Sequence, residues 1–360
     1  MQEDFHYYAT YCAAYLAGYS HEESLEVCFA AQFVDLCTAT FLSTINGPKG
    51  AATTQLSLEL MDMPTNPPGI REITSIWSSF HFLPYDLNVK RKGRSKAYMR
   101  KYRLICNPNS VLLKQTVDRA KNESLQAVGV AMHILADTWA HRYFAGTPSL
   151  VINNTDSYFY EIVKEDGVDR DRKITWKHST SFVDEIETST YVNSIYQYSE
   201  NSIMNLGHGR AGHLPDYSFI RYKYLPAWNE YEEIIKDNPS DFYHAFSQMV
   251  YAMKTLRNPT EEFRVDYYDF EALKEWEGEI KRIIETKRLS AAEDWKAFGE
   301  KLSKKEVIPF DLTPAREEYL SAQEKENTVL GRFFTAAMEQ KKMVMRKINE
   351  PKAKKNKANR

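Results

Sequence analysis

The sequence predicts an all-α protein, a multi-helix bundle with a helical C-terminal extension. Apolar residues recur at spacings of three and four through most of the 360 residues, which is typical of helices with one buried face. No alternation of apolar and polar residues is long enough to predict a sheet. Hydrophobic residues make up 43% of the chain, which is enough for a large core.

The N-terminal helices have the clearest boundaries. The first covers 3–19 and ends near Gly18, a residue type that favours helix ends. Ser20 and Glu23 have the spacing of a capping box, which predicts that a second helix follows at once. The expected helices are 3–19, 21–43, 109–145, 182–205, 217–237, 238–257, 268–289, 291–304 and 313–349.

Three segments lack a helical pattern. Residues 44–72 are rich in Gly, Pro and Thr and predict a loop. The basic segment 90–103 interleaves Lys and Arg with tyrosines. A solvated basic face, a guide for a phosphate substrate and a nucleic-acid contact all remain open for it. Residues 146–180 are expected to be irregular, with a turn in EDGVDRDRK.

The sequence predicts one main domain, a C-terminal extension and a tail, without a sharp linker between them. Residues 1–260 are expected to form the main helical domain, which also carries the candidate metal ligands described below. Residues 261–349, rich in Lys and Glu, form a helical extension that either packs on the main domain or binds a partner. The basic tail 350–360 has no apolar pattern and is expected to be disordered.

Charge and cysteine content narrow the class of protein. The 47 Lys and Arg nearly balance the 49 Asp and Glu, so the net charge indicates neither nucleic acid nor an anionic membrane as partner. No segment has the pattern of a signal peptide or of a transmembrane helix. We expect a cytoplasmic protein with reduced core thiols, and a disulfide pair is the alternative. The four cysteines are Cys12, Cys28, Cys37 and Cys106.

The stretch HILADTWAH contains the most informative residues. His133, Asp137 and His141 are spaced by four, so they share one face of a helix. Their neighbours are almost all apolar. A lone ionised aspartate there would cost several kcal/mol unless it were paired. The sequence therefore predicts either a His–Asp hydrogen-bond network or a metal site.

Other His and Asp residues lie in similarly unusual surroundings, and their number favours a metal. Neutral imidazole and carboxylate are ligands that zinc, iron and manganese share. We expect one shared site to explain these residues better than separate coincidences. The further candidates are His6, Asp35, His81, His208, His213 and Asp216.

The order of these motifs resembles that of the zinc-dependent phospholipase C / S1–P1 nuclease family. It is more closely similar to an uncharacterised bacterial family of helical proteins near it. The similarity covers about residues 1–220. The motifs that carry it are DFHYYA, QFVD, FHFLP, HILADTWAH and GHGRAGHLPD.

The resemblance implies a helical enzyme that holds up to three clustered zinc ions, with Fe or Mn as alternatives. It implies one metal on Asp35, His81 and His133, a second on His6, and Asp137 as a bridge between them. A third would lie on His141 with His208 or His213, and with Asp216. In that family a terminal amine helps to hold one metal. Either Asp4 replaces it here or that metal is absent.

The resemblance further implies a hydrolase that attacks a phosphoester with a metal-bridging hydroxide. Asp137 would act at the reacting centre. Arg210 lies beside proposed ligands in the sequence, where it would either stabilise phosphoryl charge or pair with a ligand carboxylate. The substrate would be a small phosphoester, a lipid or a nucleotide, and the oligomeric state stays open. The alternative is a non-catalytic helical interaction protein with a structural metal site.

Overall fold

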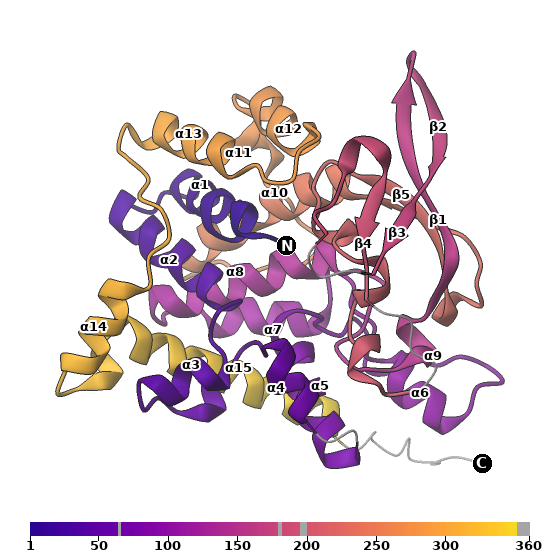
Figure 1. The fold of residues 1–360 in the computed structure, drawn as a ribbon. Helices are drawn as coiled ribbons and strands as arrows, with labels where there is room; N and C mark the ends of the chain where they lie inside the picture. Colours follow the sequence, from indigo (N-terminus) through magenta and orange to yellow (C-terminus); the bar gives the residue numbers. More distant parts are fainter. Residues whose placement is uncertain (64–65, 179–181, 195–199, 351–360) are drawn as a thin grey trace, which may run out of the picture.

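The chain folds as a mixed α/β protein. A computed structural model describes residues 1–63, 66–178, 182–194 and 200–350. Helices form the larger part, beside a four-stranded antiparallel sheet of order β2-β1-β5-β6 and a two-stranded parallel sheet of β3 and β4. The prediction of an all-α protein is therefore wrong. Figure 1 shows the sheets at one side of the helical body, with the β1–β2 hairpin projecting from it.

Helix α8 (Leu125–Ala140) lies at the centre of the helical body (Figure 1). All but the first of its sixteen residues are buried, because other helices surround it. It packs against α2, α10, α15, α7 and α5. The other helices of the N-terminal and central regions are η1 (Asp4–Ala9), α1 (Thr10–Leu16), α2 (His21–Phe33), α3 (Ala39–Thr44), η2 (Lys49–Ala51), α4 (Ser57–Asp62), α5 (Pro67–Phe80), α6 (Lys96–Tyr102), α7 (Val111–Arg119), α9 (Leu150–Asn153) and α10 (Asn238–Arg257).

The N-terminal region confirms the predicted cap and corrects the helix lengths. The side chain of Ser20 accepts from the Glu23 N–H, and the Glu23 side chain accepts in return. The helix expected over 21–43 is interrupted after Phe33, so Asp35 lies in a turn between α2 and α3. The loop expected over 44–72 contains two short helical segments, η2 and α4, and the start of α5.

The strands occupy segments that the sequence analysis assigned to loop and helix. They are β1 (Thr155–Glu165), β2 (Val168–Lys173), β3 (Thr175–Lys177), β4 (Thr190–Val192), β5 (Arg221–Pro226) and β6 (Ile234–Asp237). The expected turn is the β1–β2 connection at Asp166 and Gly167, both with positive φ. The helices expected over 182–205 and 217–237 are replaced by strands, short 3-10 turns and loop in the described part of these segments.

The sheet could not be predicted from the sequence, because one strand carries a buried charge and others are short. Glu161 lies on the inward face of β1 at only 3% exposure. It accepts from the Ser189 and Tyr191 hydroxyls, and Lys287 lies 3.0 Å away. Strand β5 alternates between half-buried and buried residues but is only six residues long. An alternation of that length does not distinguish a strand from a helix.

The C-terminal part adds helices to the same core. Leu330, Phe333 and Val344 of α15 belong to one continuous apolar cluster with Phe5 and Ile134. The expected tail, 350–360, lies outside the described residues from 351 onwards. The helices here are α11 (Phe270–Leu273), α12 (Glu277–Glu285), α13 (Ala292–Ser303), α14 (Thr313–Ser321), η8 (Lys325–Asn327) and α15 (Val329–Asn349).

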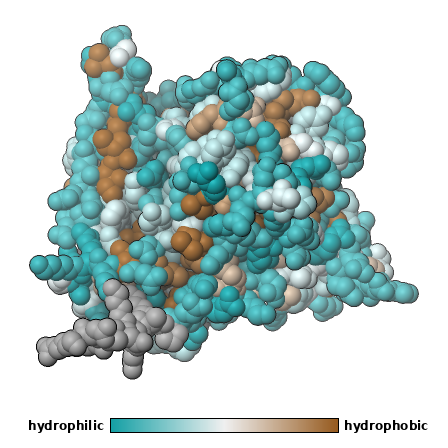
Figure 2. Space-filling view, turned by 180° about the vertical axis from the view of Figure 1, so that it is seen from behind, coloured by the Kyte–Doolittle hydropathy of each residue, from teal (hydrophilic) through white to brown (hydrophobic). Residues whose placement is uncertain are grey.

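Two other expectations are confirmed. All four cysteines are buried and free, so the prediction of unpaired core thiols holds. Among the described residues no helix combines the length and the apolar character needed to cross a membrane. Figure 2 shows that hydrophilic side chains cover most of the rear face, with an apolar strip along the hairpin. Val168 and Ile235 are the most exposed large apolar side chains of the strands.

Candidate metal centre

Helix α8 presents His133 and Asp137 on one face, one turn apart, and His141 caps its C-terminus. Both side chains on the helix are almost fully buried, at 0% for His133 and 1% for Asp137. The rest of α8 is apolar except for Gln126 and Thr138, so this face is a polar stripe within the core. The structure therefore places the predicted residues where an uncompensated charge would be most costly.

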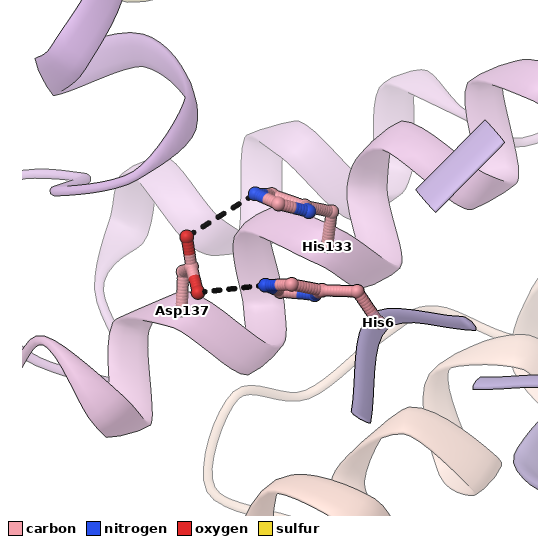
Figure 3. A group of neighbouring side chains, drawn as sticks. All are labelled: His6, His133 and Asp137. Carbon is pink, nitrogen blue, oxygen red and sulfur yellow. Dashed lines mark ion pairs between the residues drawn. The ribbon is translucent and has the colours of Figure 1, made fainter. Parts of the chain in front are cut away.

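His6 meets this face from the N-terminal segment (Figure 3). Its Nε2 lies 3.1 Å from Asp137 Oδ1, and His133 Nε2 lies 3.2 Å from Asp137 Oδ2. The His6 and His133 rings stack with centroids 3.8 Å apart. His6 belongs to η1, a π-helix, a rare form that is frequent at functional sites. His6, His133 and Asp137 form the first group that could hold a metal ion.

The second group consists of Asp35, His81 and His133. Asp35 Oδ1 lies 3.7 Å from His81 Nδ1 and 3.8 Å from His133 Nε2. Asp137 Oδ2 lies 3.1 Å from the same His81 nitrogen. The Asp35 side chain is 30% exposed, so this group has an opening to solvent. His133 Nε2 can bind only one ion at a time, whereas the two oxygens of Asp137 contact both groups, so two ions bound here would be immediate neighbours.

The third group consists of His141, His208 and Asp216. His141 Nε2 lies 3.1 Å from Asp216 Oδ1, and His208 Nε2 lies 3.5 Å from Asp216 Oδ2. The amino group of Met1 lies between this group and Asp137, at 3.3 Å from Asp216 Oδ1 and 2.7 Å from Asp137 Oδ1. Asp4 lies outside these groups, and its carboxylate accepts a hydrogen bond from the Ala291 N–H. The amine, and not Asp4, joins the cluster.

Backbone carbonyls orient four of the five imidazoles. One ring nitrogen of each lies 2.7–3.0 Å from a carbonyl oxygen, which accepts only from an N–H. In the neutral ring the other nitrogen then carries a lone pair, and it faces the cluster. The pairs are His81 with Thr53, His133 with Ala31, His141 with His81, and His208 with Gly212.

This arrangement fits a metal ion. His81 Nδ1 and His133 Nε2, both turned inward, are 3.3 Å apart, and two lone pairs at that distance need a proton or a cation between them. Both ring nitrogens of His6 are buried without a hydrogen bond. Ligating histidines in proteins commonly donate their second N–H to a carbonyl in this way. The donor set, nitrogen with carboxylate oxygen, suits zinc, iron or manganese.

Burial and nearby charges set the protonation of the ligands: for His81, burial lowers the pKa, but the hydrogen bond to Asp137 outweighs this and raises it. Burial lowers the pKa of His6 to about 4, and the charges of His133 and the Met1 amine act in the same direction. Burial also lowers the pKa of His208 to about 4. Burial alone would raise the pKa of Asp137, but its electrostatic interactions with His141 and the Met1 amine hold that pKa well below its usual range. His6 and His208 are neutral and the Asp137 carboxylate is ionised at pH 7, as metal ligands must be.

Two buried asparagines hold the loops that carry His208 and Asp216. The Asn238 amide donates to the carbonyls of Leu214 and Tyr217, on either side of Asp216, at 2.8 Å each. The Asn153 amide is shared among the carbonyls of Ala145, Thr147 and Asn205, at 2.8–3.0 Å. Both loops contain only short 3-10 turns, which leave several carbonyls without a backbone partner, so these side chains take that role.

Two glycines permit the close packing of the third group. Gly207 has φ +54°, and a Cβ there would lie 2.3 Å from the Phe82 ring. Phe82 in turn stacks on His141, with centroids 4.7 Å apart. Gly212 has φ +53°, and a Cβ there would lie 1.9 Å from the Val192 carbonyl oxygen. A side chain at either position would displace the chain on both sides of His208.

Two predicted site residues lie outside these groups of described residues. His213 is 56% exposed and its Nδ1 lies 3.2 Å from Asp184 Oδ2, which also accepts from the Tyr217 hydroxyl. Sequence reasoning missed Asp184, since VDE resembles any polar turn. Arg210 is buried and donates to Asn205 Oδ1, and its catalytic role stays a prediction.

A family model matches residues 1–348, nearly the whole chain, and its description is Family of unknown function (DUF6765). The chain belongs to this family. No curated protein and no solved structure matches the chain. All candidate metal ligands of this DUF6765 chain lie within the matched range.

Proposed function

We propose that this DUF6765 chain is a metal-dependent hydrolase of phosphoesters, with zinc as the expected metal. One observation carries the proposal: three His/Asp groups lie side by side, and His133 belongs to two of them. The Nε2 atom of His133 can bind only one ion, but a carboxylate can bridge two, and the oxygens of Asp137 contact His6 on one side and His81 on the other. Ions bridged in this way would lie a few Å apart, which is the arrangement that phosphatases and nucleases use for in-line displacement. The motif order, similar to that of phospholipase C and the P1-type nucleases, supports the same class of substrate.

The surroundings of each candidate ligand indicate its role in the proposed reaction. Bound metal ions would supply Lewis-acid polarisation of a phosphoryl oxygen and would lower the pKa of water. Asp137 contacts His6, His81 and His133, so its charge would balance part of the charge of two ions. Asp35, the most exposed ligand, lies where a substrate or water would enter and can accept a proton there.

Metal content and hydrolysis together test the proposal. We expect chain purified without chelator to carry two or three transition-metal ions, measured by elemental mass spectrometry, since the ligands form three groups. We further expect it to hydrolyse bis(p-nitrophenyl) phosphate and to lose that activity with a chelator. A metal-free chain would refute the proposal. A fully loaded chain that is inert towards phosphoesters would favour a structural metal in an interaction protein.

Metal affinity is expected to rise with pH. Burial opposes the charge of the Met1 amine, but Asp137, Asp216 and Asp35 raise its pKa to about 11. The amine is therefore protonated at pH 7, and a metal that binds it must displace that proton. Affinity for that ion should rise about tenfold per pH unit between pH 6 and 8.

Calorimetric titration with Zn²⁺ in two buffers of different ionisation enthalpy would count the released protons. His6 and His208, with a pKa of about 4, contribute none in this range. A pH-independent affinity without proton release would show that the amine binds no metal.

A further inference from the structure

We infer that Lys341, in the C-terminal helix α15, is a positioning residue for the metal group of Asp35, His81 and His133. Lys341 acts on this group through the segment 50–53, which it contacts. This inference rests on the proposed function, because it concerns the metal affinity of that group. It assigns to the C-terminal helix a role in a site whose ligands all lie in the first 216 residues.

Thr53 connects the two ligands that come from outside α8. Its hydroxyl donates to the Val34 carbonyl at 2.6 Å, directly before Asp35. Its own carbonyl lies 3.0 Å from His81 Nε2, the nitrogen opposite to the one that faces the cluster. Its N–H donates to the Cys37 carbonyl at 2.9 Å. A displacement of Thr53 would therefore move Asp35 and rotate His81 together.

Lys341 holds the residues that lead into Thr53. Its Nζ donates to the carbonyls of Gly50 and Ala52, at 2.8 and 2.6 Å. These residues lie in and directly after η2, a single 3-10 turn of three residues. A turn of this length offers few backbone partners: the Ala52 N–H donates to the Lys49 carbonyl at 3.2 Å, and the charged hydrogen bond from Lys341 holds the Ala52 carbonyl.

The same helix also restrains the other side of His81. Gln340, fully buried, donates to the carbonyl of Ser79 at 3.2 Å and to the Thr116 hydroxyl at 3.0 Å. The Lys341 Nζ lies 5.9 Å from the ring centroid of Phe80, the residue before His81. Helix α15 thus contacts the two residues that precede this ligand in α5, and it also contacts the residue that precedes its carbonyl partner, Thr53.

The test compares Lys341→Met with Lys341→Arg and Lys342→Met. The methionine keeps the apolar stem but removes the donor, whereas arginine keeps the donor. Lys342 is the matched control, since it is 76% exposed and pairs with Glu339 in its own helix. Zn²⁺ affinity would be measured by competition with a chromophoric chelator, and ligand geometry by the absorption of the Co²⁺-loaded chain.

We expect Lys341→Met to lower the affinity for one ion about 10-fold, the lower end of the loss usual when a residue behind a metal ligand is removed. Its Co²⁺ spectrum should change as well. Lys341→Arg and Lys342→Met should retain the wild-type affinity and spectrum. Wild-type affinity and spectrum in Lys341→Met would overturn the positioning role and leave the proposed function intact. A wild-type chain that binds no metal would overturn both.

A second variant keeps the test valid if Lys341→Met does not fold. Thr53→Val preserves shape and leaves Lys341 in place, but it removes the hydroxyl that donates to Val34. The same selective loss of affinity is expected, in a chain whose circular dichroism shows that it is folded. Unchanged affinity in Thr53→Val would show that Thr53 does not transmit the restraint, and would overturn the inference.

Discussion

Asp137→Asn is expected to remove the metal ions of the first two groups and to abolish hydrolysis. The Asp137 carboxylate lies within 3.5 Å of four imidazoles and the Met1 amine. An amide keeps the shape but supplies no negative charge, so the bound metal ions and the Met1 amine lose their common counter-charge. Metal affinity should fall by more than about 100-fold, since loss of even an indirect partner costs 10–100-fold.

Elemental analysis of the purified variant and its rate on bis(p-nitrophenyl) phosphate measure this result. Asp118→Asn is the control, because Asp118 is 41% exposed and pairs with Lys114 one helical turn away. The control should retain full metal content and rate. An Asp137→Asn chain that keeps all its metal would contradict the placement of this carboxylate at the centre of the cluster.

Lys236→Ala is expected to lower the free energy of unfolding more than any other variant proposed here. The Lys236 ammonium is fully buried, 2.6 Å from Asp241 and 3.0 Å from the Trp139 carbonyl. Burial lowers its pKa, while the charge of Asp241 opposes that change. Removing it leaves a buried carboxylate with Arg142 as its remaining cation and leaves a carbonyl at the end of α8 without its donor. Loss of one partner of such a pair costs about 3–5 kcal/mol.

Urea unfolding followed by circular dichroism would measure the change in the free energy of unfolding. The control is Lys254→Ala, which breaks a similar pair with Asp269 at 2.8 Å, but with the lysine 40% exposed. That variant should lose no more than about 1 kcal/mol. Equal losses in the two variants would show that the burial of Lys236 has no energetic consequence.

Several elements could be predicted from the sequence because their cause is local. The helix expected over 238–257 is α10 (Asn238–Arg257), and Ser20 caps α2 as its spacing with Glu23 indicates. The face shared by His133 and Asp137 follows from helix geometry alone. These features depend on residues within one or two turns of one another, so a short window of sequence contains the information.

The sheet and the partners of His213 could not be predicted in the same way. Glu161 on the inward face of β1 is neutralised by Lys287, which is 126 residues away, so the strand does not look apolar in sequence. Asp184 becomes the ion-pair partner of His213 only when the chain between them folds back. The predicted assignment of His213 to the metal cluster therefore had no local evidence against it.

By itself, the sequence determined which residue types are present in unusual apolar surroundings, and their spacing on α8. Only the tertiary structure decided how they group: His133 in two groups, the Met1 amine rather than Asp4 beside Asp137, and Asp35 at the opening. The reason is that helix geometry is set by bonds between near neighbours. Contacts between residues 1, 35, 81 and 216 instead depend on how distant segments pack, and no single segment encodes that.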